Sequence, residues 1–305
     1  MRVALLFPGQ GAQTPGFLGR LPQHPAVAMT LAEAREILGV ELGQLDSAAA
    51  LRSTASVQLA TVIAGVATAR ALESLGARAD AVAGLSVGAF TAAVSCGALS
   101  FADALALVRL RGAAMVEAAP GGFGMSAILG FTESRALLLI AQVSQEAPLY
   151  LASVNARTEM VVSGSETALE LAAQVAREQG AAVRRLNVSI PSHCPIMEQV
   201  SARLRKALEG VALEGARIPY VSNHRARASR EPADIAADLA LNVSRTVRWH
   251  DSVTLLYELG CRVFIEPPPG QVLSALVSEA FPEARALALE STPLAGVAML
   301  VQPGG

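Results

Sequence analysis

Short, continuous apolar runs alternate along the chain with longer segments of helical periodicity. Residues 3–7 and 81–85 are rich in Ala, Val and Leu, as expected for strands that are buried on both faces. Residues 26–38 and 56–75 repeat apolar side chains at helical spacing, and each segment is followed by a glycine that can end a helix. This alternation predicts an α/β fold built on a mostly parallel sheet.

A different pattern occupies residues 124–188, where the expected elements follow in the order β-α-β-β-α-β. This order is that of a small ferredoxin-like unit. We therefore expect a small subdomain over residues 124–188, inserted into a larger one made of residues 1–123 and 189–305. Its strands are predicted at 125–129, 150–154, 160–163 and 182–186, and its helices at 133–144 and 167–179.

After the insertion, the pattern of the larger subdomain returns. It predicts a helix over 195–208, a strand near 219–222, a helix over 233–241, a helix after Trp249, a strand over 261–266 and a helix over 272–280. Beyond Leu289 the periodicity is weak, which predicts a loose tail.

The composition argues against several functional classes. Hydrophobic residues make up 52% of the 305 residues and charged residues 16%, so a large core can form. The formal net charge of −2 disfavours a nucleic-acid surface or a polybasic membrane patch. Charges, glycines and prolines are expected to interrupt every apolar stretch before the roughly 18 residues of a membrane span, and the apolar N-terminus is too short for a signal peptide.

The cysteines indicate the compartment. Cys96, Cys194 and Cys261 are odd in number and scattered, which favours free thiols in a reducing cytosol. No cluster of cysteines and histidines has the spacing of metal ligands, so no metal site is expected. We expect a cytoplasmic protein without nucleic-acid or membrane partners.

The pentapeptide Gly84-Leu85-Ser86-Val87-Gly88 is a G-x-S-x-G motif between a predicted strand and a predicted helix. In this context the serine occupies a sharp turn that exposes its hydroxyl. Glycines suit such a turn because the backbone is strained and passes close to its neighbours. The following helix directs free N–H groups toward any oxyanion that forms there. Ser86 is therefore the candidate nucleophile.

A serine nucleophile needs a base, and the chain offers four histidines. His193 stands out because Pro191 and Pro195 stiffen its loop. The structural alternative, a histidine held by hydrogen bonds, is the commoner role of an arbitrary histidine. The neighbouring Cys194 suggests a Cys–His pair, but adjacent residues of an extended loop point to opposite sides. We therefore predict His193 as the base.

An oxyanion needs hydrogen-bond donors. The Val87 backbone N–H, at the predicted helix start, is one candidate, and Gln10, between two glycines after the first strand, is the second. The structural alternative for residues 9–11 is a tight turn. A phosphate-binding loop is excluded because no Gly-Lys-Ser/Thr follows, and Thr14 stands where a dinucleotide fingerprint has its third glycine.

Arg111 lies on the apolar face of a helix predicted over about 102–117, together with Leu107, Val108 and Met115. A guanidinium on such a face needs an anionic partner, because burying it alone is costly. Either an internal Asp or Glu or a substrate carboxylate could serve. In the second case Arg111 would form a bidentate clamp, with hydrogen bonds of roughly 1.5–3 kcal/mol each.

Together, these motifs resemble those of malonyl-CoA:acyl carrier protein acyltransferases. The resemblance runs in the family's order from about residue 3 to residue 280. It implies a large α/β-hydrolase-like subdomain with a parallel sheet, a small ferredoxin-like subdomain, and an active site between them. The matching segments are FPGQGAQ (7–13), GLSVG (84–88), VRLRG (108–112), PSHCPIM (191–197), NVSRTVRW (242–249) and EPPPGQVL (266–273).

The resemblance implies a role for each residue of these motifs. Ser86 would be the acylated nucleophile and His193 its base. Gln10 and the Val87 amide would form the oxyanion hole. Arg111 would hold the free carboxylate of the malonyl group.

Two further residues and one departure follow from the same resemblance. Asn242 takes the position whose main-chain carbonyl orients the histidine, where the family commonly has Gln. Asn155 falls in the segment of the small subdomain that lines the cleft. Leu85 replaces the histidine of the usual G-H-S-x-G. With residues 86–90 it resembles the malonate decarboxylase epsilon subunit, a malonyltransferase.

The resemblance thus implies transfer of a malonyl group from malonyl-CoA to the prosthetic-group thiol of an acyl carrier protein, through a malonyl-serine intermediate. The expected partner is the carrier subunit of malonate decarboxylase, and no metal or permanently bound cofactor is implied. Three alternatives stay open. A transferase of fatty-acid or polyketide synthesis would use another carrier, a serine thioesterase or hydrolase would use water, and a docking subunit would not react.

Overall fold

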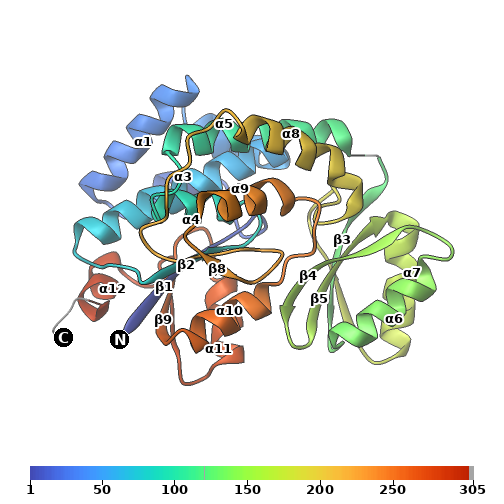
Figure 1. Cartoon of the computed structure of the whole chain (residues 1–305). Coiled ribbons are helices and arrows are strands. Elements are labelled where there is room, and N and C mark those ends of the chain that lie inside the picture. Colours follow the sequence, from blue (N-terminus) through green and yellow to red (C-terminus); the bar gives the residue numbers. More distant parts are fainter. Residues whose placement is uncertain (120, 302–305) are drawn as a thin grey trace.

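Two β-sheets organise the chain, of which the computed structural model describes residues 1–119 and 121–301 (Figure 1). Neighbouring strands of the larger sheet run parallel, except the last pair. This arrangement confirms the predicted α/β fold with a mostly parallel sheet. Its six strands lie in the order β10 (Arg285–Ala288), β9 (Cys261–Glu266), β1 (Arg2–Phe7), β2 (Ala81–Gly84), β7 (Tyr220–Val221) and β8 (Ala228–Ser229).

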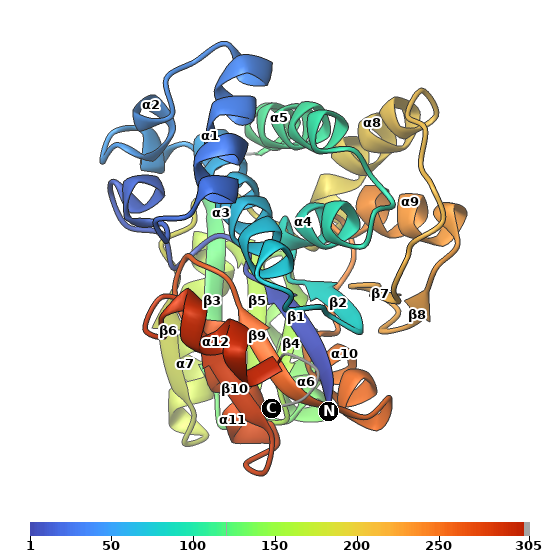
Figure 2. The ribbon, with the colours of Figure 1, turned by 90° about the vertical axis from the view of Figure 1, so that its left-hand side faces the viewer.

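Helices cover both faces of this sheet, as Figure 2 shows. One face carries α3 (Thr54–Ser74), α4 (Gly88–Ser95), α5 (Phe101–Ala118), α8 (Glu198–Leu208) and α9 (Pro232–Leu241), with α1 (Pro25–Leu38) outside them. The other carries α10 (Trp249–Glu258) and α11 (Val272–Ala280). The shorter helical segments are α2 (Gly43–Asp46) and three 3-10 turns, Phe17–Arg20, Ala50–Arg52 and Pro195–Met197, the last of which leads into α8.

Side-chain alternation along β1 divides the core into two layers. Val3, Leu5 and Phe7 belong to the cluster under α3, α4 and α5, whereas Ala4 and Leu6 belong to the cluster under α10 and α11. A strand buried on both faces has no polar side, which is why its sequence reads as a continuous apolar run.

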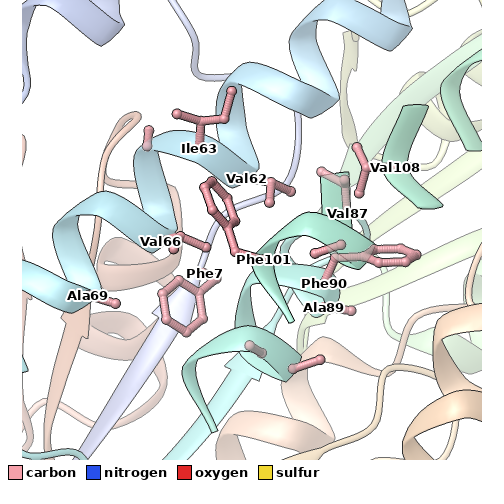
Figure 3. Packing of buried hydrophobic residues seen from close by; sticks show 14 of the residues in the cluster. Phe7, Val62, Ile63, Val66, Ala69, Val87, Ala89, Phe90, Phe101 and Val108 are labelled. Atoms are coloured by element: carbon pink, nitrogen blue, oxygen red, sulfur yellow. The ribbon is translucent and has the colours of Figure 1, made fainter. Parts of the chain in front are cut away.

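Helix α3 lies at the centre of the first layer. Figure 3 shows its residue Val66 beside Phe7 of β1, and Val62 and Ile63 farther along the helix in the same cluster. By length and hydropathy this helix is apolar enough to cross a membrane, contrary to the expectation that no segment would be, yet 83% of its apolar window is buried inside the protein. Its composition is that of a helix covered on all sides by protein.

The second sheet is antiparallel throughout. Its strands lie in the order β4 (Leu149–Ala156), β5 (Glu159–Ser165), β3 (Phe123–Leu129) and β6 (Ala182–Arg185). Helices α6 (Glu133–Val143) and α7 (Glu166–Glu178) pack on one of its faces (Figure 1). The chain order β3-α6-β4-β5-α7-β6 confirms the predicted β-α-β-β-α-β succession.

A backbone bridge joins the small sheet to the larger part of the chain, which is built on the six-stranded sheet. Val247, just before α10, donates to the Ala152 carbonyl and accepts from the Val154 N–H, both at 2.9 Å. Next to it, Arg248 forms a salt bridge with Glu133 at the start of α6. The small sheet is therefore held against α10 at one edge.

The last part of the chain differs from the prediction. The segment expected to be loose after Leu289 contains α12 (Leu294–Val301), whose Leu294 and Val297 are buried in the first core layer. Residues 302–305 of that predicted tail lie outside the described residues. One eight-residue helix is too short to give a clear period, so only its burial in the folded chain identifies it.

Candidate active site

Ser86 sits on a left-handed turn between β2 and α4. Its φ of 56° is one that residues other than glycine rarely adopt. A Cβ on Gly84 would lie 2.0 Å from the Gly88 carbonyl oxygen, and one on Gly88 would lie 2.3 Å from that of Phe7. Both glycines are therefore required by the close approach of β1, β2 and α4, which fixes where the Ser86 hydroxyl emerges.

The structure brings His193 to this hydroxyl from 107 residues away in the sequence. Its Nε2 lies 2.8 Å from Ser86 Oγ. On the other side of the ring, Nδ1 donates to the Asn242 carbonyl at 2.5 Å, so the predicted main-chain contact is present. With its proton on Nδ1, the imidazole offers a free lone pair at Nε2 to the serine hydroxyl.

The surroundings of His193 keep it neutral. Burial, together with the positive charge of Arg111, lowers the pKa of His193 to about 4. Both effects act against the protonated form. At neutral pH the ring is therefore unprotonated and can accept the serine proton.

Arg111 reaches the same hydroxyl from the middle of α5. It is 1% exposed, and its Nη2 lies 3.2 Å from Ser86 Oγ and 3.5 Å from Asn242 Oδ1. Burial lowers the pKa of Arg111 to about 9, which leaves it protonated at neutral pH. The guanidinium makes no ion pair with any residue in 1–119 or 121–301, so an internal Asp or Glu is not its partner.

Two residues at this site had not been predicted. Gln58 on α3 accepts a hydrogen bond from Arg111 Nη1 at 2.7 Å and so orients the guanidinium. Asn223, in the loop after β7, accepts from the Ser86 N–H at 2.8 Å. The single glutamine in the mostly apolar sequence of α3 was a usable signal for Gln58. Nothing in the local sequence of Asn223 distinguishes it.

Donors for an oxyanion lie at the start of α4. The Val87 N–H makes no hydrogen bond within the part of the chain that the structure describes. The loop that carries Gln10 packs on the serine turn, since a Cβ on Gly9 would lie 2.9 Å from the Leu85 carbonyl oxygen. Gln10 lines the same cleft as Ser86. The Gln10 loop and the start of α4 therefore both adjoin the serine turn, and an oxyanion hole formed by Gln10 and the Val87 N–H stays a prediction.

The cleft has a volume of about 470 Å³ and lies between the two parts of the chain. The larger part contributes Ser86, His193 and Arg111, and the small sheet contributes Asn155. The Asn155 side chain bonds to Ser153 and Glu159 and makes no hydrogen bond to the serine or histidine. A larger hollow of about 750 Å³ between α1, α3 and α5 is lined by neither a histidine nor a cysteine.

Comparison with known proteins matches nearly the whole chain to one family. The family described as "Acyl transferase domain" matches residues 4–299. The malonyl CoA-acyl carrier protein transacylase of Bacillus subtilis (strain 168) is 36% identical over 285 residues, covering 91% of this chain and 90% of the relative.

Solved structures agree with this comparison. The acyl-carrier-protein S-malonyltransferase of Burkholderia pseudomallei 1710b is similar with a TM-score of 0.93 at 33% identity, over 98% of this chain and 100% of the other. A malonyl-transacylase in complex with its type II PKS acyl carrier protein is similar with a TM-score of 0.91 at 30% identity, over 98% of this chain and 99% of the other.

Proposed function

The chain belongs to the malonyl-CoA:acyl carrier protein acyltransferase family, and from this premise we propose that it moves a malonyl group from malonyl-CoA to the prosthetic thiol of an acyl carrier protein. One observation carries the proposal. Ser86 Oγ lies 2.8 Å from an imidazole nitrogen and 3.2 Å from a buried guanidinium that has no carboxylate partner within residues 1–119 and 121–301. A nucleophile, a base and an anion-binding group thus share one cleft.

In the first half-reaction, His193 Nε2 takes the Ser86 proton while Oγ attacks the thioester carbonyl. The carbonyl oxygen becomes an oxyanion, which accepts hydrogen bonds from Val87 N–H and Gln10. Collapse of this intermediate breaks the C–S bond. His193 returns its proton to the leaving thiolate of CoA, and malonyl-Ser86 remains.

In the second half-reaction, the carrier's thiol gives its proton to His193 and attacks the acyl-serine carbonyl. The same donors hold the second oxyanion. Its collapse breaks the ester C–Oγ bond, and His193 returns the proton to Ser86 Oγ as the malonyl-carrier thioester is released. The Asn242 carbonyl keeps the imidazole in one tautomer throughout. These steps require no metal or redox cofactor, because proton transfer and hydrogen bonding supply the chemistry.

Arg111 would select the acyl group. A malonyl carboxylate can accept two hydrogen bonds from the guanidinium in place of the long Nη2 contacts to Ser86 and Asn242, whereas an acetyl group would leave the buried charge unpaired. Gln58 keeps the guanidinium oriented for this contact. We propose that Asn155, on the opposite wall of the cleft, contacts the pantetheine arm that the thioester carries.

Mass spectrometry of the intact protein tests this function. After incubation with malonyl-CoA, the wild-type chain should gain the mass of one malonyl group, mapped by peptide analysis to Ser86, and Ser86→Ala should gain none. Adding a carrier protein bearing its phosphopantetheine arm should then remove the group from Ser86 and place it on the carrier. An adduct that forms equally on Ser86→Ala would contradict the proposal.

A transferase and a hydrolase differ in what accepts the malonyl group from Ser86: a carrier thiol in the transferase and water in the hydrolase. A hydrolase would release malonate from malonyl-CoA rapidly without any carrier, so free malonate should be measured with and without carrier. Fast release that does not depend on the carrier would favour the hydrolase. Transfer to the carrier with slow hydrolysis would favour the transferase.

The carrier itself can be narrowed to two candidates. Relatives named for acyl carrier protein transacylation favour a carrier of fatty-acid or polyketide synthesis. A specific residue favours the second candidate, the malonate decarboxylase carrier subunit, because Leu85 replaces the histidine of G-H-S-x-G as in that branch. Offering malonyl-enzyme to both carriers and comparing kcat/KM decides between them.

We propose a cytoplasmic location, since the three cysteines are free and buried.

A further inference from the structure

The Asn223 side chain holds the backbone on both sides of the nucleophile. Its Oδ1 accepts from the Ser86 N–H and its Nδ2 donates to the Gly84 carbonyl, both at 2.8 Å. The side chain is buried, at 3% exposure, so water cannot replace these bonds. Because the Ser86 amide is occupied, the next amide, that of Val87, is the one left free at the start of α4.

A fully buried carboxylate fixes Asn223 in turn. Asp238, on α9, is 0% exposed and accepts from the Asn223 N–H at 2.9 Å and from its Nδ2 at 3.3 Å. The same carboxylate accepts from Tyr220 Oη at 2.6 Å and from His224 Nδ1 at 2.8 Å. A buried carboxylate with this many donors holds each of them in one geometry, because losing any leaves an unsatisfied charge-assisted bond.

The same helix also holds the base. Asn242 caps α9 one turn after Asp238, and its N–H donates to the Asp238 carbonyl at 2.9 Å. The Asn242 carbonyl then accepts from His193 Nδ1. The last turn of α9 is therefore connected to the serine through Asn223 and to the histidine through Asn242.

We infer that this turn of α9 sets the alignment of the Ser86–His193 pair, and that Asn223 is the positioning residue that carries the alignment to the serine. The inference rests on the proposed acyl transfer. Asn223 makes no hydrogen bond to the serine hydroxyl or the imidazole; it acts through the backbone of the turn. Without it, the left-handed turn can relax, and both the hydroxyl and the Val87 N–H move relative to His193.

The test uses a fluorophosphonate probe, which reacts with an activated serine whatever the natural acyl group is. Asn223→Ala should lower the second-order rate of Ser86 labelling by about 10- to 100-fold, the size expected for a misplacement of up to about 1 Å. With malonyl-CoA, kcat should fall by a similar factor while KM changes by less than about threefold, because Arg111 is untouched. Asp238→Asn, which keeps the side-chain volume, should show the same direction and serves if Asn223→Ala does not fold.

A control separates positioning from general loss of stability. Leu72→Ala removes a buried side chain near the C-terminal end of α3, 14 residues along that helix from Gln58, and should lower the melting temperature yet leave labelling at the wild-type rate. Wild-type labelling in folded Asn223→Ala, or equal slowing in Leu72→Ala, would overturn the inference. If the wild-type chain loaded no carrier, the proposed function would fail, while labelling of Ser86 would still report on Asn223.

Discussion

At the scale of single residues, a buried cation governs the site. Arg111 is 1% exposed, and its polar contacts are to a serine, a glutamine and an asparagine. Its Nε has no hydrogen-bond partner among the residues that the structure describes. A buried charge in this state is destabilised by desolvation, which is the cause of its lowered pKa. The site is therefore prepared for an anion that restores the missing interactions.

Replacing Arg111 by alanine should separate malonyl from acetyl transfer. Loss of the clamp removes about 3 kcal/mol of interaction with the malonyl carboxylate, so kcat/KM for malonyl-CoA should fall by about 100-fold or more. Acetyl transfer should stay level or rise, since no unpaired charge then faces the methyl group. Steady-state kinetics with both thioesters measure this, and an equal loss for the two would contradict the clamp.

The low pKa of His193 predicts that the rate falls only at unusually low pH. The base is active when unprotonated. Because kcat/KM reports the free enzyme, a pKa of about 4 for His193 means that kcat/KM should remain level from about pH 8 to about pH 5. A malonyl carboxylate on Arg111 offsets part of the positive charge that lowers this pKa. The acid limb of kcat should therefore lie at higher pH than that of kcat/KM. Rates measured across this range check both limbs; if both lay near pH 6.5, the expected effect of burial would be wrong.

At the scale of elements, glycine determines how closely the pieces of the site approach. The serine turn is enclosed by β1 and α4, and neither glycine of the pentapeptide has room for a Cβ. Farther along, a Cβ on Gly112, next to Arg111, would lie 2.6 Å from the Ala55 Cα of α3. Helices α3 and α5 can thus approach at the point where Gln58 meets Arg111.

Gly88→Ala should be destabilising and inactivating. The new methyl group would lie 2.3 Å from the Phe7 carbonyl oxygen, so α4 must shift, and we expect a loss of about 2 kcal/mol or more in the free energy of unfolding. The matched control is Gly296→Ala in α12, where an added Cβ meets no described atom within 4 Å outside its own stretch of helix and helix propensity predicts a gain of up to about 1 kcal/mol. Urea unfolding measures both, and similar values for the two variants would refute the close-packing argument.

At the scale of the whole molecule, the cleft exists because two sheets meet. Ser86, His193 and Arg111 come from the larger part, and Asn155 comes from the small sheet. The backbone bridge at Val247 and the Arg248–Glu133 salt bridge keep these walls together. Substrate contacts from both walls therefore depend on bonds that lie outside the cleft.

Glu133→Gln should loosen this junction. Both partners are about two-thirds buried, and Arg248 also holds Asp251, so we expect a loss of about 1 kcal/mol in unfolding free energy. KM for malonyl-CoA should rise severalfold, because the two walls no longer keep one spacing. Glu117→Gln breaks a more exposed pair with Arg203 inside the larger part and should change neither quantity appreciably. Thermal unfolding and steady-state kinetics compare the two, and equal KM values in both variants would contradict the expectation.

Local patterns in the sequence were sufficient for much of the fold. The apolar runs of β1, β2 and β9 mark strands buried on both faces, and the helical period of α5 places Arg111 on its apolar side. These properties depend on neighbours in the sequence, so they can be read without knowing the rest of the fold. The short α12 was missed because its apolar side chains acquire a partner only when the chain has folded.

Within the site, the sequence by itself determined the nucleophile turn, since G-x-S-x-G between a strand and a helix is a local arrangement. It also left the partner of Arg111 open. Only the tertiary structure decided that no carboxylate in the described chain reaches this guanidinium, that Gln58 orients it from 53 residues away, and that Asn223 holds the Ser86 backbone from 137 residues away. Partners at such separations are chosen by the packing of whole elements, and short sequence patterns carry no record of that packing.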